Sequence, residues 1–393
     1  MSATKITLKA GKEQSIKRFH PWIFSGAIHK VEGQAHNGDI VDVLDSKGNY
    51  LGTGHASEGS IAVRIFSFTG YENPTKFWLG KIKNAYDLRE RLGFISNNET
   101  NIYRLVNAEG DGLPGLIVDV YGSTAVIQTH SVGMYEQRQT IADAIVNVYG
   151  GKILSVYDRG DGKASTQQQE IAGEYLFGSK QSDVCLEYGC KFHVDWEQGQ
   201  KTGFFIDQRE NRKLLGAYAS GKKVLNTFCY TGGFSVFALK AGAILAHSLD
   251  SSQKALVLAT QNAKLNGFDD ERHDVIKADA VEYMKSLRED YDVIILDPPA
   301  FAKHLSARHK AVQGYIRINE AAIRQIKPGG VIFTFSCSQA IDKKLFRDSL
   351  LAASINAGRK VRILHQLHQP ADHPISVYHP EGEYLKGFVI EVE

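Results

Sequence analysis

Cysteine is scarce in this sequence, and its spacing fits no metal site. The 393 residues contain four cysteines, at positions 185, 190, 229 and 337. Four are too few for a disulfide framework, and no CxxC pair or His/Cys cluster has zinc-site spacing. We therefore expect reduced thiols and no metal ion. We expect Cys185 and Cys190, which flank Gly189, to lie on a hairpin.

Long apolar runs are also absent. Nowhere do 18 apolar residues follow one another, and the stretch MSATKITLKAGKEQ has neither an apolar core nor a small-residue cleavage site. These absences favour a cytoplasmic protein. With 43% hydrophobic residues the chain can bury a large core, and its length suggests two or three domains.

Net charge is small but uneven. It is +2 overall, yet the first 30 residues contain six lysines and arginines and one acid, Glu13. A basic end on a near-neutral chain favours a polyanionic partner, although a solvated surface without a partner would look the same. The candidates here for contact with RNA phosphates are Lys12, Lys17 and Arg18.

The same end interleaves basic and aromatic residues, in KRFHPWIFSGAI at 17–28. Such a segment can hold phosphates and stack bases, but dense aromatics also fill the core of a small barrel. The short alternating strands between residues 6 and 68 predict such a β-barrel. We expect Trp22 in its core, and Lys17 and Arg18 facing RNA.

A second region follows residue 72. The pattern predicts a helix that ends at Gly93, with one apolar face, and then a ββαβ unit of mixed strands and helix. The helix face comprises Trp78, Ile82, Ala85, Leu88 and Leu92, and the strands are expected at 103–106, 116–121, 125–129 and 152–157. A polar run, RGDGKASTQQQE, marks a boundary. We expect domains over residues 1–72, 73–180 and 181–393.

From about residue 184 the pattern alternates strand and helix, which is typical of a doubly wound α/β sheet. Strands are expected in KKVLNTF, AILAHSLD, HDVIKAD, YDVIILD, GGVIFTFSCS, VRILHQL and YLKGFVIEV. After the second of these, we expect Ser251 to cap the next helix.

The fourth of these strands runs into YDVIILDPPAF, at 291–301. A continuous apolar run suits a strand buried on both faces, and ligands bind beyond the carboxyl ends of such strands. Asp297 is therefore expected at a pocket. Pro298 and Pro299 make the following backbone a stiff ledge whose carbonyls suit a flat, donor-bearing base. A plain Pro-rich turn is the alternative.

Three successive strands end in an acid, and the first strand ends in a TGG turn. Asp250 suits the two hydroxyls of a ribose, and Asp279 could accept from an adenine amino group. Dinucleotide folds require GxGxxG to bind pyrophosphate, whereas this turn is CYTGGF. S-adenosylmethionine has no phosphate, so it fits better. Each acid taken alone could instead be a surface cap.

Cys337 follows the fifth strand, in TFSCS. Adjacent strands bring their ends together, so its thiol and Asp297 could share a pocket, although a buried cysteine is usually a small core residue. A thiolate that adds to C6 of a pyrimidine makes C5 nucleophilic. Asp297 would then hold N3 or the exocyclic amino group as charge develops.

Acids are missing from residues 300–319, which contain Lys303, Arg308, Lys310 and Arg317. Beside a pocket, such a basic loop would face phosphates. A solvated loop is the alternative.

Residues 184–393 resemble class I S-adenosylmethionine-dependent methyltransferases. The whole chain resembles the bacterial 23S rRNA cytosine-C5 methyltransferases that carry an amino-terminal PUA domain. The matching stretches are HPWIFSGAI, RLVNAEGDGLPGLIVDVYG, KTGFFIDQRENR, VLNTFCYTGGFSV, LDPPAF, TFSCS and ADHPISVYHPEGEYLKGF. The resemblance implies a PUA β-barrel, a small central α+β domain and a Rossmann-like catalytic sheet of seven strands.

The resemblance also implies site residues. The nucleophile would be Cys337, and S-adenosylmethionine would contact Phe205, Asp207, Gln208, Arg209, Phe228, Cys229, Tyr230, Gly232, Gly233, Asp250, Ser251, Asp279 and Asp297. Amino-methylating enzymes place an aromatic directly after the prolines, whereas here Ala300 intervenes. The other large cytosine-C5 class has a second cysteine at this motif, which this chain lacks.

The resulting hypothesis is an S-adenosylmethionine-dependent enzyme that forms 5-methylcytosine in large-subunit rRNA and can form a homodimer. Uridine C5 remains open because C6 addition serves both pyrimidines, and guanine is a further alternative. An inactive RNA-binding assembly factor would not need Asp250, Asp297 and Cys337. A dehydrogenase is disfavoured by the missing GxGxxG.

Overall fold

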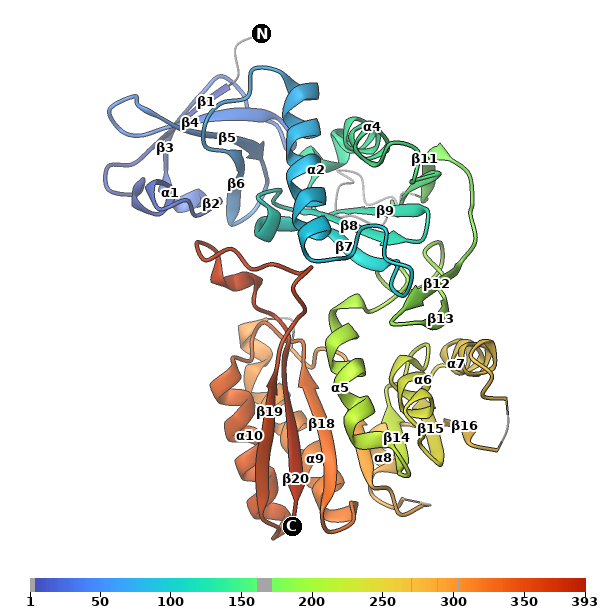
Figure 1. Ribbon diagram of the computed structural model, residues 1–393. Coiled ribbons are helices and arrows are strands. Elements are labelled where there is room, and N and C mark those ends of the chain that lie inside the picture. Colours follow the sequence, from blue (N-terminus) through green and yellow to red (C-terminus); the bar gives the residue numbers. More distant parts are fainter. Residues whose placement is uncertain (1–3, 161–171, 270, 288, 303) are drawn as a thin grey trace. The chain divides into compact units, whose positions relative to one another are not determined.

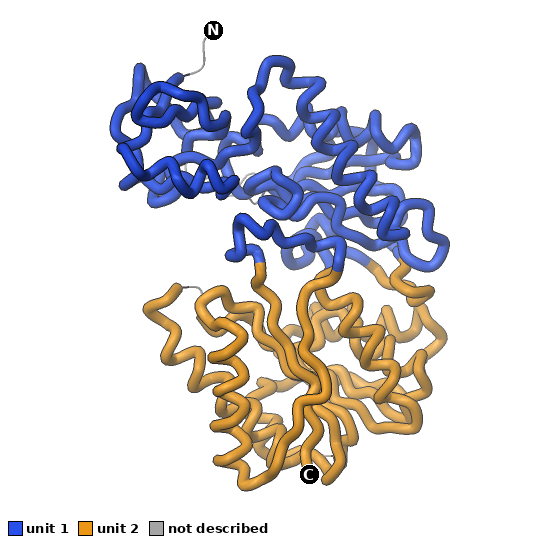
Figure 2. Tube along the Cα trace, turned by 60° about the vertical axis from the view of Figure 1, so that its left-hand side comes forward, with its two compact units in different colours: residues 1–185, 194–204, 371–382 blue, residues 186–193, 205–370, 383–393 orange. Residues whose placement is uncertain are grey.

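The structure is a computed structural model that describes residues 4–160, 172–269, 271–287, 289–302 and 304–393. The chain forms two compact units (Figure 2). Unit 1 comprises residues 1–185, 194–204 and 371–382, and unit 2 comprises 186–193, 205–370 and 383–393. Most of the polar run at 159–170 lies outside the described residues. In the described part of the chain, no helix is long and apolar enough to cross a membrane.

The first part of unit 1 is a six-stranded sheet in the order β2-β6-β5-β4-β1-β3 (Figure 1). Burial alternates along its strands, as in β4, where Val41 and Val43 are buried and their neighbours are not. The predicted run of short strands is confirmed. The elements are β1 (Thr4–Leu8), α1 (Gln14–Lys17), β2 (Trp22–Phe24), η1 (Ser25–Ala27), β3 (Ile28–Glu32), β4 (Ile40–Leu44), β5 (Tyr50–Ala56) and β6 (Ile61–Ser67).

Trp22 does not lie in the core of this sheet, so that prediction was wrong. Strand alternation places the neighbouring Ile23 in the core, and Trp22 is half-buried on the other face. There its indole Nε1 donates to Glu109 Oε1 at 2.9 Å, and its ring lies 4.3 Å from that of His379. A half-buried indole therefore satisfies its donor with a carboxylate.

The second part of unit 1 packs two longer helices on a five-stranded sheet of order β11-β10-β9-β8-β7. Asn73 caps the first helix through Lys76 N, and Pro74 begins it. Its predicted face is confirmed at Trp78, Ile82 and Ala85, whereas Leu92 is exposed. The elements are α2 (Pro74–Arg91), β7 (Ile102–Asn107), η2 (Ala108–Asp111), β8 (Leu116–Tyr121), β9 (Thr124–Thr129), α3 (Val132–Glu136), α4 (Arg138–Tyr149), β10 (Ser155–Asp158) and β11 (Glu174–Gly178).

The predicted hairpin is confirmed. Cys185 lies in β12 (Val184–Glu187) and Cys190 in β13 (Cys190–His193). Tyr188 and Gly189 join them with φ of 48° and 69°, which is the left-handed pair that a two-residue hairpin turn needs.

Unit 2 is a seven-stranded sheet of order β16-β15-β14-β17-β18-β20-β19. All its pairs are parallel except those of β20, which runs antiparallel to both neighbours. The chain order reverses between β14 and β17, the point where ligands bind in such sheets. The elements are η3 (Ile206–Gln208), α5 (Arg209–Ala219), β14 (Lys223–Thr227), α6 (Gly233–Lys240), β15 (Leu245–Asp250), α7 (Gln253–Leu265), β16 (His273–Lys277), α8 (Ala280–Tyr283), β17 (Val293–Leu296), η4 (Leu305–Ala307), α9 (Arg308–Gln325), β18 (Gly330–Ser336), α10 (Lys343–Ala357), β19 (Val361–Leu367), η5 (Pro380–Gly382, within unit 1) and β20 (Lys386–Val392).

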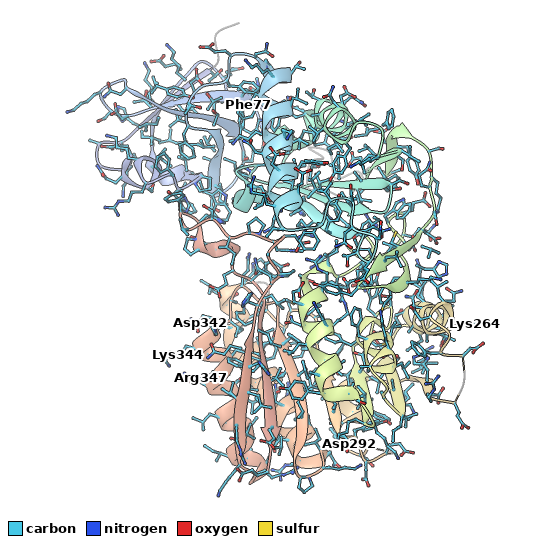
Figure 3. The ribbon with its side chains drawn as sticks, viewed as in Figure 1. Phe77, Lys264, Asp292, Asp342, Lys344 and Arg347 are labelled. Carbon is cyan, nitrogen blue, oxygen red and sulfur yellow. The ribbon has the colours of Figure 1, made fainter. Side chains whose placement is uncertain are left out.

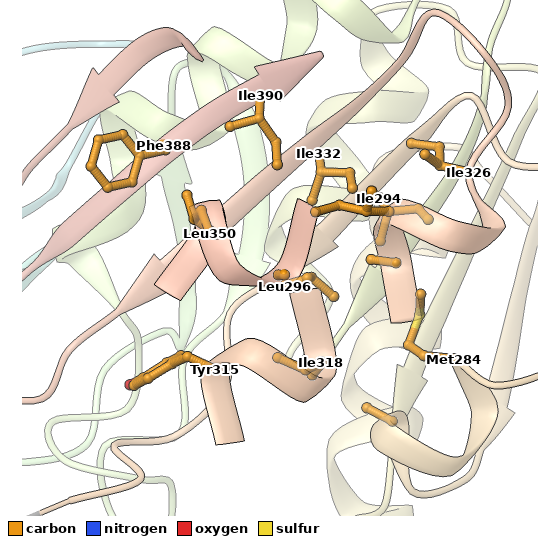
Figure 4. Packing of buried hydrophobic residues seen from close by; sticks show 14 of the residues in the cluster. Met284, Ile294, Leu296, Tyr315, Ile318, Ile326, Ile332, Leu350, Phe388 and Ile390 are labelled. Atoms are coloured by element: carbon orange, nitrogen blue, oxygen red, sulfur yellow. The ribbon is translucent and has the colours of Figure 1, made fainter. Parts of the chain in front are cut away.

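Helices α9 and α10 bury one face of this sheet. Ile294 and Leu296 of β17 and Ile332 of β18 pack against Ile318 of α9, with every one of these side chains fully buried (Figure 4). Tyr315 of α9 packs in the same cluster, with its hydroxyl at the edge of the group (Figure 4). The core thus fixes β17, β18 and α9 relative to one another.

Two local predictions in unit 2 were wrong. Ser252, and not Ser251, caps α7, because its side chain accepts from Ala255 N. The stretch 300–319 is not a loop throughout, since α9 begins at Arg308. No side chain caps α9 at Ala307, so the usual sequence signal for a helix start is missing there.

Candidate active site

The turn that follows β14 holds strained backbone. Phe228 and Tyr230 have φ of 53° and 46°, and Gly232 has φ of 76°. Left-handed conformations cost energy in residues other than glycine, and they concentrate at ligand-binding sites. At Gly232 a Cβ would come within 2.9 Å of Ala259 Cβ in α7. The TGG sequence therefore permits both the turn and the close approach of α7.

Asp250, at the end of β15, ties this turn to α7. Its Oδ2 accepts from Tyr230 N at 3.1 Å, and its Oδ1 accepts from Ser252 N at 2.9 Å. The carboxylate is half-buried, and a carboxylate has about four lone-pair sites. It is thus held in one orientation and keeps capacity to accept from ligand hydroxyls. Ser251, beside it, is exposed.

Asp279 has a different position. It is exposed and caps α8, where its Oδ1 accepts from Glu282 N at 3.0 Å. The structure therefore shows Asp279 Oδ1 as a helix cap at the surface, which was the alternative interpretation of this acid. A contact with an adenine amino group stays a prediction.

The segment 205–209 connects the turn at 228–233 to Asp297. The ring of Phe205 meets that of Tyr230 edge-on at 5.2 Å. Gln208 Nε2 donates to Asp297 Oδ2 at 3.0 Å, and Gln208 Oε1 accepts from Asn211 at 2.6 Å. One short segment thereby positions side chains at both places.

The remaining two predicted residues of this segment are buried. Asp207 accepts from the Tyr384 hydroxyl at 2.8 Å, and Arg209 lies 3.3 Å from Glu210. The contact of Asp207 ties the segment to Tyr384, whereas that of Arg209 joins neighbours in the chain.

Sequence reasoning missed the ion pair that supports this segment. Arg212 Nε and Nη2 donate to the two oxygens of Glu187 at 2.7 and 2.8 Å, and all these atoms are buried. The third nitrogen, Nη1, donates to Phe205 O at 3.0 Å. Arg212 ends the stretch KTGFFIDQRENR, but Glu187 lies 25 residues away and outside every matching stretch, so no local signal could have paired them.

Asp297 and Cys337 follow neighbouring strands, as predicted. Strand β17 pairs in parallel with β18, with Leu296 beside Thr334, so the two strands end at the same edge of the sheet. Ser338 Oγ donates to Ala302 O at 2.6 Å and joins the two segments that leave these strands. Cys337 is half-buried, and so is Asp297.

Tyr315 is a second residue that sequence reasoning missed. Its hydroxyl oxygen accepts from Ser336 Oγ at 2.9 Å. Burial raises the pKa of Tyr315 to about 12, and the charges of Cys337 and Asp297 add to that shift. The phenol from α9 therefore shares its surroundings with both predicted catalytic residues.

The other three cysteines are all buried. Burial raises the pKa of the Cys185 thiol to about 12 and that of Cys190 to about 11. Burial and the charge of Asp250 raise the pKa of Cys229, in the turn at 228–233, further still. Neutral, enclosed thiols are poor nucleophiles. Among the described residues, no group of three or more His, Cys, Asp and Glu side chains is arranged to hold a metal ion.

The basic candidates differ in their surroundings. In unit 2, Arg308 Nη2 donates to Asp342 Oδ2 at 3.0 Å, and Lys310 and Arg317 are exposed on α9. Figure 3 shows Asp342 near Lys344 and Arg347 along the edge formed by α10. Lys303 lies outside the described residues.

In unit 1, Lys12, Lys17 and Arg18 are all exposed. Lys17 Nζ lies 3.7 Å from Asp45 and 4.0 Å from Glu13, which partly neutralise it. Lys12 and Arg18 form no ion pair with any residue that the structure describes.

Two family models match the chain. One, described as a PUA-like domain, covers residues 6–68. The other, described as an S-adenosylmethionine-dependent methyltransferase, covers residues 150–380. The predicted amino-terminal PUA-like domain and the predicted cofactor, S-adenosylmethionine, are thereby confirmed.

Relatives and solved structures agree with these matches over the full length. The ribosomal RNA large subunit methyltransferase I of Aeromonas hydrophila is 40% identical over 399 residues and that of Shewanella denitrificans 38% over 399, with at least 99% of each chain covered.

A putative methyltransferase from Streptococcus mutans shares the fold at a TM-score of 0.84 and 24% identity, over 98% of this chain and 99% of the other. A further putative methyltransferase structure, in complex with SAH, gives 0.85 at 24% identity over the same shares. The predicted fold class is confirmed. This chain belongs to the S-adenosylmethionine-dependent methyltransferase family and, within it, to the full-length group named ribosomal RNA large subunit methyltransferase I.

Proposed function

We propose that the protein methylates C5 of a cytosine in large-subunit rRNA through a covalent adduct between Cys337 and C6 of the base. The observation that carries this proposal is the placement of Cys337. Three of the four cysteines are buried, and Cys337 is half-buried. It follows β18, which pairs with β17, and Asp297 follows β17. Its position suits a nucleophile, whereas the other three thiols are enclosed.

The residues present fit S-adenosylmethionine. The left-handed turn at 228–233 and the oriented carboxylate of Asp250 form a cradle for a nucleoside without phosphate. The expected contacts are the turn residues Phe228, Cys229, Tyr230, Gly232 and Gly233, with Phe205 and Asp250 beside them. When bound, the cofactor supplies an electrophilic methyl group.

The chemistry of the base follows from the thiolate. The sulfur of Cys337 forms a bond to C6, and the electron pair of the C5–C6 double bond becomes available at C5. C5 then takes up the methyl group. Removal of the C5 proton re-forms the double bond, and the C6–S bond breaks so that its electron pair returns to sulfur.

Asp297 would hold the base during these steps. Its bond to Gln208 Nε2 fixes the carboxyl group, which in its ionised form accepts from the exocyclic amino group and in its protonated form donates to N3 as negative charge spreads into the ring. The ledge of Pro298 and Pro299 supports this role, since neither residue has an amide donor that would compete with the base.

Unit 1 would bind the RNA. Phe19 and Tyr378 are each about half exposed, and their ring centroids lie 5.3 Å apart. Phe19 also has φ of 63°, a conformation that costs energy. Exposed rings in the same unit as the exposed cations Lys12 and Arg18 suit stacked bases and phosphates. The relatives' name and the PUA-like domain support large-subunit rRNA as the target.

Nucleoside mass spectrometry tests this function. Purified protein, 23S rRNA lacking the modification and labelled S-adenosylmethionine should give labelled 5-methylcytidine. Labelled 5-methyluridine or a methylguanosine would instead establish one of the alternative bases. No labelled nucleoside from any rRNA substrate, with cofactor bound, would favour an inactive assembly factor.

A further inference from the structure

Lys386 is a buried cation beside the predicted nucleophile. It is the first residue of β20, is 4% exposed, and pairs in register with Ser336 at the end of β18. Its Nζ donates to Ser338 O at 2.7 Å. The ammonium therefore lies on the short segment 336–338 that carries Cys337.

The face of the sheet is also defined. Directly paired residues of an antiparallel ladder point to the same face, so Lys386 leaves β20 on the side where Ser336 reaches Tyr315. The next residue, Gly387, leaves no room for a side chain, because a Cβ there would come within 2.6 Å of Phe335. Close packing of β20 on β18 thus fixes the base of the lysine side chain.

A buried ammonium needs a negative partner, since burying an unpaired charge is costly. The charged neighbours of Lys386 are Cys337, Glu383 and Asp342, in decreasing order of effect. Both carboxylates are exposed, and Asp342 already binds Arg308 and caps α10. Cys337, in contrast, is partly buried, so water screens its charge less than that of the two carboxylates.

We propose that the Lys386 ammonium is the counter-ion of the Cys337 thiolate and that it prepares this sulfur for attack on C6. The inference rests on the proposed function. The thiol proton leaves to water, the lysine keeps its own proton, and no bond to the amine forms. Lys386 acts through Cys337 and is therefore a positioning residue.

The protonation state of the amine agrees with this role. Burial lowers the pKa of Lys386 to about 8, and Cys337 opposes that shift. At neutral pH most of the amine is thus charged. Coupling between two sites is reciprocal, so a cation that gains from the thiolate also stabilises it.

The test is the pH dependence of Cys337 alkylation in the full chain without RNA. Iodoacetamide reacts with the thiolate, and peptide mass spectrometry separates Cys337 from the three buried thiols. In Lys386→Met the half-maximal rate should move up by about one to three pH units, the usual effect of one close charge. Reaction at pH 7 should slow at least about tenfold, and Lys386→Arg should stay near the wild type.

A second variant leaves Lys386 in place. In Cys337→Ser the amine loses its partner, so acylation of Lys386 by acetic anhydride should reach half-maximum at lower pH than in the wild type. This arm decides the question if Lys386→Met fails to fold, as judged by its thermal transition and cofactor binding.

Unchanged alkylation in folded Lys386→Met, or unchanged acylation in Cys337→Ser, would overturn the assignment. Cys337 in Lys386→Met could instead be alkylated as in the wild type, while the variant accumulates a covalent adduct with unmodified cytidine RNA. In that case the lysine removes the C5 proton and our proposal is wrong. Neither alkylation nor acylation measures methylation. If the enzyme modifies another nucleobase or another RNA, the expected alkylation and acylation results stay the same. Failure of this inference can therefore be told apart from failure of the proposed function.

Discussion

The two halves of the sheet in unit 2 hold their functional side chains differently. In the half formed by β14, β15 and β16, Asp250 and Asp279 accept from backbone amides of nearby turns and helix starts. In the half formed by β17, β18 and β20, the contacts come from side chains that belong to distant parts of the chain. Gln208 binds Asp297, α9 brings Tyr315, and β20 brings Lys386.

This difference separates two tasks. On the proposed function, backbone contacts fix the half that binds the cofactor, with little dependence on neighbouring side chains. The other half would have to tune the charge of a thiol, which requires ionisable groups placed at short range in a poorly solvated region. Substitutions in the two halves should therefore fail in different ways, by loss of cofactor affinity in one and by loss of chemistry in the other.

The largest expected effect is that of Cys337→Ala. Removing the nucleophile should lower methylation at least about a thousandfold, while calorimetric affinity for S-adenosylmethionine stays within about twofold. Cys190→Ala is the matched control, because Cys190 is fully buried on a hairpin and has no chemical step. Substantial turnover by Cys337→Ala would break the division between the halves.

An intermediate effect is expected for Asp250→Ala. A hydrogen bond to a charged group contributes roughly 1.5–3 kcal/mol, so cofactor affinity should fall about ten- to hundredfold, as isothermal titration calorimetry can measure. The comparison variant is Asp279→Ala, which removes an exposed helix cap. It should lower thermal stability slightly and change cofactor affinity less. Equal losses in both variants would contradict the distinction between the two acids.

The smallest effects are expected in unit 1, where the basic side chains are exposed. Replacing Lys12, Lys17 and Arg18 by Ala should weaken RNA binding for every sequence. It should also flatten the plot of log affinity against log salt by about 0.7 per lost phosphate contact on single strands. Because Asp45 and Glu13 already neutralise Lys17 in part, its share should be the least.

Cofactor affinity should not change in that triple variant. Lys264→Ala is a control, since Lys264 is an exposed lysine on α7 (Figure 3). A wild-type salt slope in the triple variant would mean that the basic residues face solvent and nothing else.

The same contrast explains what the sequence could predict. The strands and the acids at their ends follow from apolar runs that stop at Asp250 and Asp297, which are local signals. The placement of Cys337 and Asp297 at the same edge of the sheet follows from the adjacency of successive parallel strands. These predictions concern the cofactor half and the strand order.

The supports of the catalytic half have no such local signal. Lys386 reaches the site only because β20 inserts antiparallel beside β18. Tyr315 reaches the site from α9. This helix begins at Arg308 without a capping side chain, so the sequence carries no signal for its start. The prediction for Trp22 was wrong because pairing of β2 with β6 turns Ile23, and not Trp22, toward the core.

The most direct test of the central claim is covalent trapping on RNA that contains 5-fluorocytidine. Fluorine at C5 cannot leave as a proton does, so after methyl transfer the C6–S bond cannot break. We expect a stable protein–RNA adduct that depends on S-adenosylmethionine and that mass spectrometry maps to Cys337, with no adduct from Cys337→Ala. An adduct on another cysteine would contradict the account, and so would efficient 5-methylcytidine formation without an adduct.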